Sequence, residues 1–108
     1  MIKCGIDLVL NKRIEKNISS PEFLSKVFNP SELKLGKHKL PGIFTLKEAT
    51  MKAIGKKCDW KDIEVLFNLA GKPEISLSSE IKPKKLKSID ASISHDGDYT
   101  IGLVVLEL

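Results

Sequence analysis

The hydrophobic pattern of the chain changes its period at Gly55, and this change does most to limit the folds that the chain can adopt. Before Gly55, residues 43–54 carry apolar side chains at helical spacing, and Pro41-Gly42 introduces the segment. After Gly55 the period is two at 63–67 and 89–93, a short strand contains Ile75 and Leu77, and 99–108 is a final apolar strand. Alternation of this kind is typical of strands that bury one face. The pattern predicts a helix followed by about four strands.

The first ten residues predict one more strand. The apolar residues alternate along one of its faces, and Asp7 is the one acid on the other face. Ser20-Pro21-Glu22 and Asn29-Pro30-Ser31-Glu32 each predict the start of a short helix, because a capping residue precedes a proline. Asp96-Gly97 predicts a hairpin turn before the last strand. The order of elements predicts an α+β fold, with a largely antiparallel sheet packed against helices.

Length and composition favour one domain spanning residues 1–108. Only two cysteines occur, too few for a disulfide scaffold, so reduced thiols and a cytoplasmic protein are expected. The longest apolar run, 101–106, is far shorter than the ~20 residues that cross a bilayer, so no membrane association is expected. The net charge of +4 reflects lysines at 34–39 and 82–87. These lysines form either a solvated surface or one that attracts polyanions: nucleic acid, phosphorylated cofactors or acidic proteins.

Two places along the chain carry acids that could take part in chemistry. Asp7 is either a solvated strand acid, paired with Lys3 or Arg13, or a ligand. Glu48 precedes Lys52 by four residues, the spacing of a helix-stabilising pair. However, two acids from separate elements are also what Mg²⁺ needs when it binds a phosphate, and a nearby lysine would neutralise charge on a leaving phosphate.

A third place, 94–99, contains Ser94-His95-Asp96. Adjacent residues of a strand point to opposite faces, which argues against a catalytic triad in this run. A pair of Cys58 with His95 has no local support as an activated thiol, and the two aspartates lack the rest of a calcium loop. Without further information, the segment is also explained as a polar hairpin turn.

Together these segments resemble the holo-[acyl-carrier-protein] synthases, the short bacterial branch of the phosphopantetheinyl transferases. The resemblance rests on segments that occur in the family's order from Met1 nearly to Leu108. They are Gly5-Ile6-Asp7-Leu8-Val9 with Arg13, Phe28-Asn29-Pro30-Ser31-Glu32-Leu33, Phe44-Thr45-Leu46-Lys47-Glu48-Ala49 with Lys52-Ala53-Ile54-Gly55, Asp62-Ile63-Glu64-Val65, Gly71-Lys72-Pro73, and Ser92-Ile93-Ser94-His95-Asp96.

The resemblance implies the family's fold, a homotrimer, and Mg²⁺-dependent transfer of 4'-phosphopantetheine from coenzyme A to a serine of apo acyl carrier protein, a step of fatty acid biosynthesis. Asp7 and Glu48 would hold Mg²⁺ on the pyrophosphate, Glu48 would help to deprotonate the serine, and Lys52 would assist departure of adenosine 3',5'-bisphosphate. The implied coenzyme A contacts are Lys47, Lys52, Gly55, Lys56, Gly71, Pro73, Ser94 and His95. The implied contacts to the acidic carrier protein are Arg13, Lys16 and Lys26.

The chain departs from the family's pattern at several positions. Leu10 and Asn11 replace an acid and an apolar residue, and Ile43 stands where an arginine is common. The segment between Leu33 and Phe44 is short. The alternative from another class is a small basic nucleic-acid-binding module. Such modules usually show aromatic stacking platforms, whereas aromatics make up 6% of this chain, so no nucleic-acid partner is expected.

Overall fold

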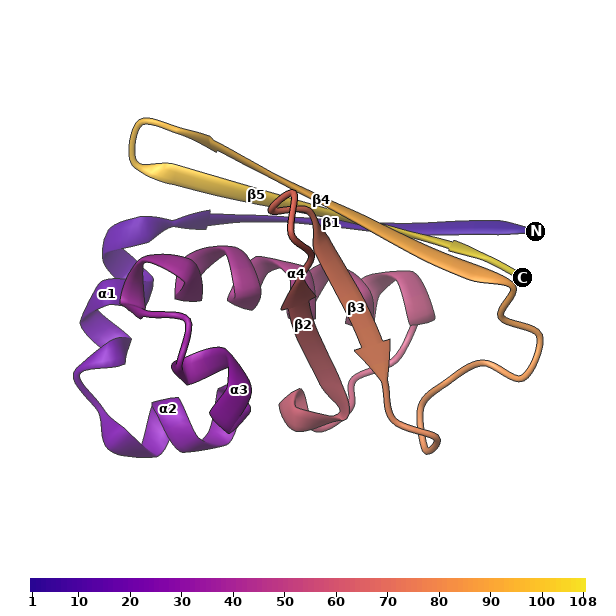
Figure 1. Cartoon of the computed structure of the whole chain (residues 1–108), viewed down its shortest axis with the longest axis horizontal. Helices are drawn as coiled ribbons and strands as arrows, with labels where there is room; N and C mark the ends of the chain where they lie inside the picture. The colour runs from indigo at the N-terminus through magenta and orange to yellow at the C-terminus, as the bar shows by residue number, and fades with distance from the viewer.

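A three-stranded antiparallel sheet packs against one long helix (Figure 1). The computed structural model describes residues 1–108. Strand β5 (Tyr99–Glu107) lies between β1 (Ile2–Leu10) and β4 (Ser88–Asp96), and helix α4 (Leu40–Ile54) lies against one face of this sheet. The two ends of the chain meet at one end of the sheet, where the Leu108 amide donates to the Met1 carbonyl. None of the helices is both long and apolar enough to cross a membrane.

Two glycines let α4 approach the sheet closely. A Cβ atom on Gly5 of β1 would lie 1.9 Å from the carbonyl oxygen of Ala49, and one on Gly102 of β5 would lie 2.8 Å from Thr45 Oγ1. Any larger residue would therefore force the helix away from the strands. Because the helix backbone touches β1 at Gly5, the side chain of Asp7, on the same face, lies beside α4.

The alternation of β1 predicts the strand correctly, but the buried face is the one with fewer apolar residues. Gly5 and Val9 are buried against α4, and Asp7 is half-buried between them. The apolar face points away from the helix, with Ile6 54% and Leu8 60% exposed. Exposed Leu103 and half-buried Ile101 and Val105 of β5 continue this apolar surface.

Short helices pack beside the first half of α4 (Figure 1). They are α1 (Asn11–Ile18), α2 (Pro21–Val27), α3 (Pro30–Leu33) and the 3₁₀ turn η1 (Lys37–Lys39). The sequence predicts the starts of α2 and α3 but not α1, which has no capping side chain before it. Two buried residues four apart, Ile14 and Ile18, are the signal in the sequence that marks α1.

The remaining strands form a separate hairpin and do not extend the main sheet. The 3₁₀ turn η2 (Trp60–Asp62) leads into β2 (Ile63–Phe67), which pairs antiparallel with β3 (Pro73–Leu77). The prediction of one antiparallel sheet is therefore corrected to two. The predicted turn at Asp96-Gly97 is confirmed, with Gly97 at a φ of +57° between β4 and β5. The α+β class is confirmed.

Candidate functional site

Asp7, Glu48 and Lys52 lie together where β1 meets α4. Glu48 and Lys52 are one turn apart on the helix, and Asp7 reaches them from the strand. Lys52 Nζ lies 2.9 Å from the carbonyl oxygen of Ile6 and 3.4 Å from Asp7 Oδ1. The three ion pairs of the structure do not include Glu48, so Lys52 bridges the helix to the strand instead of forming the local Glu48–Lys52 pair.

The environment of Glu48 disfavours its negative charge. Burial raises the pKa of Glu48, the nearby charge of Asp7 raises it further, and Lys52 acts in the opposite direction. Two carboxylates are thus held close despite their repulsion, an arrangement that a bound cation would relieve. No group of three or more His, Cys, Asp or Glu side chains could hold a metal alone. The pair suits a cation such as Mg²⁺, which takes one or two carboxylates and fills its shell with water and phosphate oxygens.

A positively charged hollow of about 520 Å³ opens beside Glu48 at the end of α4. Lys52, Lys56 and Lys57 contribute three ammonium groups, whereas Glu48 is the single acid of the lining. Gly55 ends the helix at a φ of +87°, which turns the chain so that Lys56 follows along the wall. The lining is completed by Met51, Cys58 and Trp60. Of the residues predicted to contact coenzyme A, the structure places Lys52, Gly55 and Lys56 here.

A second hollow, of about 170 Å³, brings together Gly71, Pro73 and His95 from β3, β4 and the turn before β3. His38 and Lys39 from η1 also line it, and no carboxylate does. Lys39 Nζ lies 4.5 Å from the centre of the Phe67 ring, within range of a cation–π contact. The remaining lining residues are Gly42 and Ile93. Sequence analysis did not single out His38 or Lys39 as site residues, because nothing local in the sequence relates η1 to β4.

Ser94 lies outside this hollow. It precedes His95 on β4, and successive side chains of a strand point to opposite faces. Ser94 is exposed and opposite Ile101, on the face turned away from α4. The two residues that the resemblance pairs at the nucleotide end therefore lie on different sides of one chain.

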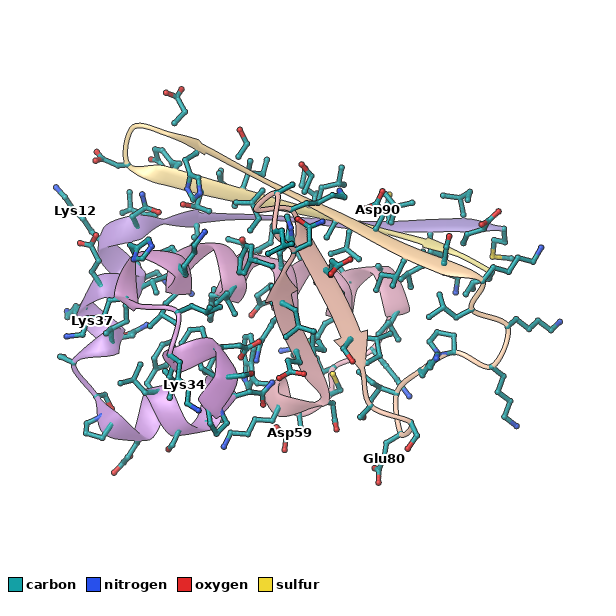
Figure 2. The ribbon with its side chains drawn as sticks, in the orientation of Figure 1. Lys12, Lys34, Lys37, Asp59, Glu80 and Asp90 are labelled. Carbon is teal, nitrogen blue, oxygen red and sulfur yellow. The ribbon has the colours of Figure 1, made fainter.

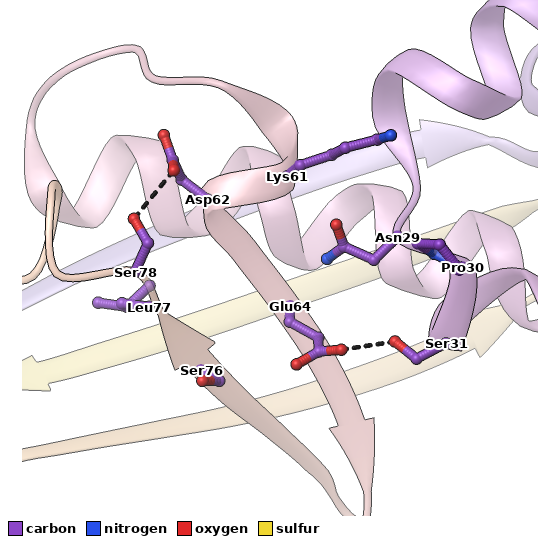
Figure 3. Close-up of a pocket in the computed structure, with 9 residues that line it drawn as sticks. All are labelled: Asn29, Pro30, Ser31, Lys61, Asp62, Glu64, Ser76, Leu77 and Ser78. Carbon is purple, nitrogen blue, oxygen red and sulfur yellow. Dashed lines mark hydrogen bonds between the residues drawn. The ribbon is translucent and has the colours of Figure 1, made fainter.

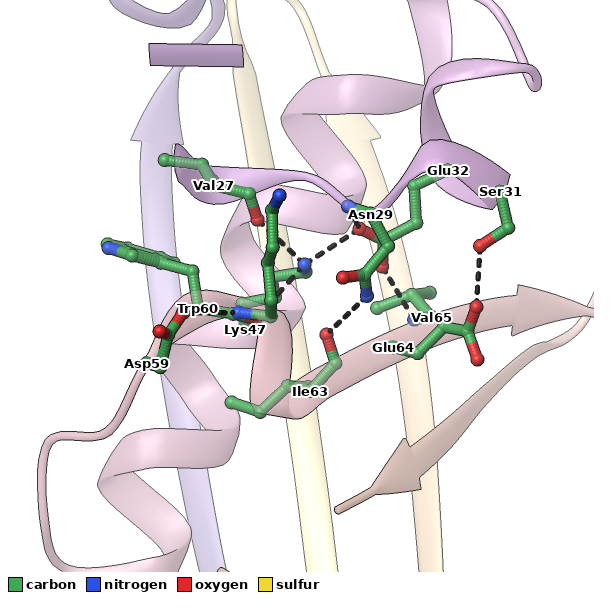
Figure 4. A network of polar contacts seen from close by, with 11 residues as sticks. Val27, Asn29, Ser31, Glu32, Lys47, Asp59, Trp60, Ile63, Glu64 and Val65 are labelled. Atoms are coloured by element: carbon green, nitrogen blue, oxygen red, sulfur yellow. Dashed lines mark hydrogen bonds and ion pairs between the residues drawn. The ribbon is translucent and has the colours of Figure 1, made fainter. Parts of the chain in front are cut away.

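Lys47 does not line either hollow, which corrects its assignment as a coenzyme A contact. It lies instead in a network of polar contacts between α3, α4 and β2 (Figure 4). Its side chain is 0% exposed, and its Nζ lies 2.7 Å from Glu32 Oε1 and 2.7 Å from the carbonyl oxygen of Val27. A third contact, of 3.2 Å, is to the carbonyl oxygen of Trp60. Burial lowers the pKa of Lys47, against the hydrogen bond and charge of Glu32. All three ammonium hydrogens have partners, so Lys47 has a structural role.

A third hollow, of about 500 Å³, lies between α3 and the β2–β3 hairpin (Figure 3). Its acids face hydroxyl groups: Ser31 donates to Glu64 and Ser78 donates to Asp62. Lys61 is its one basic residue. Since its charge is mainly negative, this hollow is unsuited to phosphate groups.

The basic residues predicted to contact a partner lie on the exposed sides of α1 and α2. Arg13, Lys16 and Lys26 are exposed, and none is in an ion pair. Arg13 is therefore not neutralised by Glu15 or Glu22. Figure 2 shows Lys12, Lys34 and Lys37 at the same end of the molecule, which is formed by the short helices.

Comparisons with known proteins identify the family and the fold. Residues 3–104 match the family described as the 4'-phosphopantetheinyl transferase superfamily. The chain is 39% identical to a holo-[acyl-carrier-protein] synthase of Helicobacter pylori, over 94% of this chain and 94% of that protein. It is 33% identical to a holo-[acyl-carrier-protein] synthase of Caldanaerobacter subterraneus, over 94% of this chain and 91% of that protein. The crystal structure of a Helicobacter pylori holo-[acyl-carrier-protein] synthase in complex with coenzyme A superposes with a TM-score of 0.88 at 37% identity, covering 99% of this chain and 100% of that one.

Proposed function

The chain belongs to the holo-[acyl-carrier-protein] synthases of the 4'-phosphopantetheinyl transferase superfamily, and we propose that it transfers 4'-phosphopantetheine from coenzyme A to a serine of apo acyl carrier protein. The product pair is holo acyl carrier protein and adenosine 3',5'-bisphosphate, in fatty acid biosynthesis. The observation that carries the proposal is the Asp7–Glu48 pair with Lys52, beside a hollow lined by lysines. Two free cysteines fit a reducing cytoplasm.

The mechanism assigns a role to each residue of this cluster. Asp7 and Glu48 would hold Mg²⁺, which when bound would neutralise charge on the pyrophosphate of coenzyme A. The serine oxygen attacks the phosphorus that carries the pantetheine, and the bond from this phosphorus to the bridging oxygen breaks. Glu48 is the base of this cluster and takes the serine proton. Lys52 donates to the departing phosphate, with Lys56 and Lys57 nearby.

A transfer assay by mass spectrometry tests this assignment. We expect Asp7→Ala and Glu48→Ala each to reduce the formation of holo carrier protein by about 10²–10³-fold, with little change in unfolding, because neither side chain is part of the hydrophobic core. Glu64→Ala is the matched control, since Glu64 is a half-buried acid of the third hollow. Chelation should stop the wild-type reaction and Mg²⁺ should restore it. Folded Asp7 and Glu48 variants with near-normal turnover would contradict the assignment.

We further propose that the enzyme is a homotrimer, with coenzyme A bound between subunits. Support comes from the apolar outer face of the sheet, where Ile6, Leu8 and Leu103 are exposed. The Asp7–Glu48 pair lies by the edge strand β1, whereas the hollow of His95 lies by the opposite edge strand β4. A ring of subunits would bring the β1 edge of one chain to the β4 edge of the next, so that one donor uses both hollows.

Light scattering tests the oligomer. We expect three times the 12.0 kDa chain mass for the wild type, and dissociation with loss of transfer for Leu103→Glu, which places a charge in the apolar face. Leu33→Glu is the control, because Leu33 is an exposed leucine at the end of α3, outside the main sheet. A stable wild-type monomer that transfers at the same concentration would refute the trimer.

Finally, we propose that Arg13, Lys16 and Lys26 contact the acidic carrier protein. All three are exposed cations without acidic partners. We expect Arg13→Glu to weaken use of the carrier protein much more than use of coenzyme A, and the difference from wild type to shrink as salt screens the contact. Lys85→Glu, on the exposed loop before β4, is the control. Equal effects on the two substrates would show that Arg13 is not at the docking surface.

A further inference from the structure

His95 is held by two side chains that nothing above assigns to the site. Its Nδ1 lies 2.9 Å from Thr100 Oγ1, and the hydroxyl of Thr100 donates to Asn11 Oδ1 at 2.6 Å. Thr100 is 1% exposed, so its hydroxyl has no access to bulk water. The three residues come from β4, β5 and the start of α1 and form one hydrogen-bonded row.

Backbone pairing holds these three hydrogen-bonded residues in place. His95 and Thr100 face each other in the antiparallel register of β4 and β5. The Asn11 amide N–H donates to the carbonyl oxygen of Asp98 at 2.8 Å, which ties the start of α1 to the same hairpin. The Asn11 side chain thereby reaches Thr100, whose hydroxyl donates to Asn11 Oδ1.

The donor-to-acceptor direction of these two hydrogen bonds determines which imidazole nitrogen of His95 carries the hydrogen. A threonine hydroxyl has a single hydrogen, and here Asn11 accepts it. The oxygen of Thr100 must then accept from His95, so Nδ1 carries a hydrogen. Nε2 is left for the hollow that His95 lines with His38 and Lys39. When the ring binds an anion both of its nitrogens carry a hydrogen, so that Nε2–H donates to the anion while Nδ1–H donates to Thr100 Oγ1.

We propose that Asn11 and Thr100 are positioning residues, which orient His95 so that Nε2 meets a phosphate group of coenzyme A. This inference rests on the proposed function for the identity of the ligand, but the orientation of the ring can be measured without any ligand. Neither residue touches the phosphate. Their effect on binding acts through the orientation of the His95 ring and through the acceptor that Thr100 gives to its Nδ1–H.

Nuclear magnetic resonance of the ring nitrogens tests the orientation. The chain has two histidines, so His38 serves as an internal reference. We expect neutral His95 of the wild type in the Nδ1–H form, Thr100→Val to shift it toward the Nε2–H form, and Thr100→Ser to keep the wild-type form. His38 should be unchanged in all variants. A wild-type His95 in the Nε2–H form would overturn the proposal before any variant is made.

Binding of coenzyme A tests the consequence. We expect Thr100→Val and Asn11→Leu each to raise the Kd by about fivefold, as for one misplaced hydrogen bond, and Thr100→Ser to remain within about twofold of wild type. Thr50→Val is the control, because Thr50 is a buried threonine whose hydroxyl donates only to the Leu46 carbonyl. An unchanged Kd in both Thr100→Val and Asn11→Leu would refute the positioning role. A wild type that transfers nothing would instead refute the proposed function and leave the nuclear magnetic resonance result valid.

Discussion

Two acid–lysine pairs join α4 to its surroundings, and they differ in almost every physical respect. Glu32 and Lys47 are both 0% exposed and 2.7 Å apart. Asp7 and Lys52 are 3.4 Å apart, with the lysine 55% and the acid 16% exposed. The two lysines are five residues apart on one helix, which directs one into the protein and the other toward the edge of β1.

The buried pair is a closed network. Glu32 accepts from the backbone N–H groups of Asn29 and Val65 in addition to Lys47, and thereby links α3, α4 and β2 (Figure 4). No buried side-chain nitrogen or oxygen is left without a partner. In the Asp7–Lys52 pair, the longer contact and partial exposure leave donor and acceptor capacity for a ligand. Similar residue types therefore stabilise the fold where they are fully enclosed, and we propose that they serve chemistry where they are open.

Replacing each lysine by methionine gives the largest expected contrast. Lys47→Met should destabilise the fold by about 3–5 kcal/mol, because Glu32 would keep a buried charge without its partner. Lys52→Met should change stability by less than about 1 kcal/mol, as for an exposed ion pair, yet reduce transfer by about 10–100-fold. Urea unfolding and the transfer assay measure the two effects.

A double variant sharpens this test. Glu32→Gln removes the charge but keeps a carbonyl oxygen for the N–H groups of Asn29 or Val65. Combined with Lys47→Met, it should recover part of the lost stability, because the uncompensated charge is gone. If Lys47→Met alone unfolded no more easily than Lys52→Met, the distinction between a structural and a chemical pair would be wrong.

The sequence contained a signal for the burial of Lys47 but not for its partner. Lys47 lies between Ile43 and Thr50 on the apolar side of the helix, at the i+4 spacing from Ile43, so its burial follows from periodicity. The resemblance placed it beside Glu48 in the cleft instead. Its contact with Glu32 spans fifteen residues of chain and depends on how α3 packs, which no local pattern encodes.

The faces of β1 show a second limit of sequence reasoning. Alternation identifies the strand, but it does not say which face meets α4. Gly5 settles this in the structure, since only its lack of a side chain lets the helix reach the strand. The apolar residues, which would ordinarily indicate the core side, are left exposed on the outer face. In contrast, Asp7, Glu48 and Lys52 could be selected from the sequence because they lie in recognisable segments, and the structure brings them together.

The smallest expected effect concerns the stability of Glu48→Gln. Burial and the charge of Asp7 raise the pKa of Glu48 in the folded protein above its value in the unfolded chain. As the pH rises through the interval between these two values, the unfolded chain releases this proton first, so the free energy of unfolding decreases. Above that interval, Glu48→Gln should therefore be more stable than the wild type, and below it the two should be equal. The difference should stay below about 1 kcal/mol, because Glu48 is only half-buried.

Thermal unfolding of the wild type and of Glu48→Gln across this pH range, with transfer measured in parallel, tests this prediction. A neutral glutamine cannot take the serine proton, so Glu48→Gln should gain stability while losing transfer. Wild-type transfer should decrease as the pH falls and Glu48 becomes protonated, because the protonated acid can neither act as a base nor hold Mg²⁺. Addition of Mg²⁺ with coenzyme A should stabilise the wild type more than the variant, since a bound cation removes the repulsion between Asp7 and Glu48. A variant less stable than the wild type at every pH would mean that Glu48, like Glu32, mainly holds the fold together.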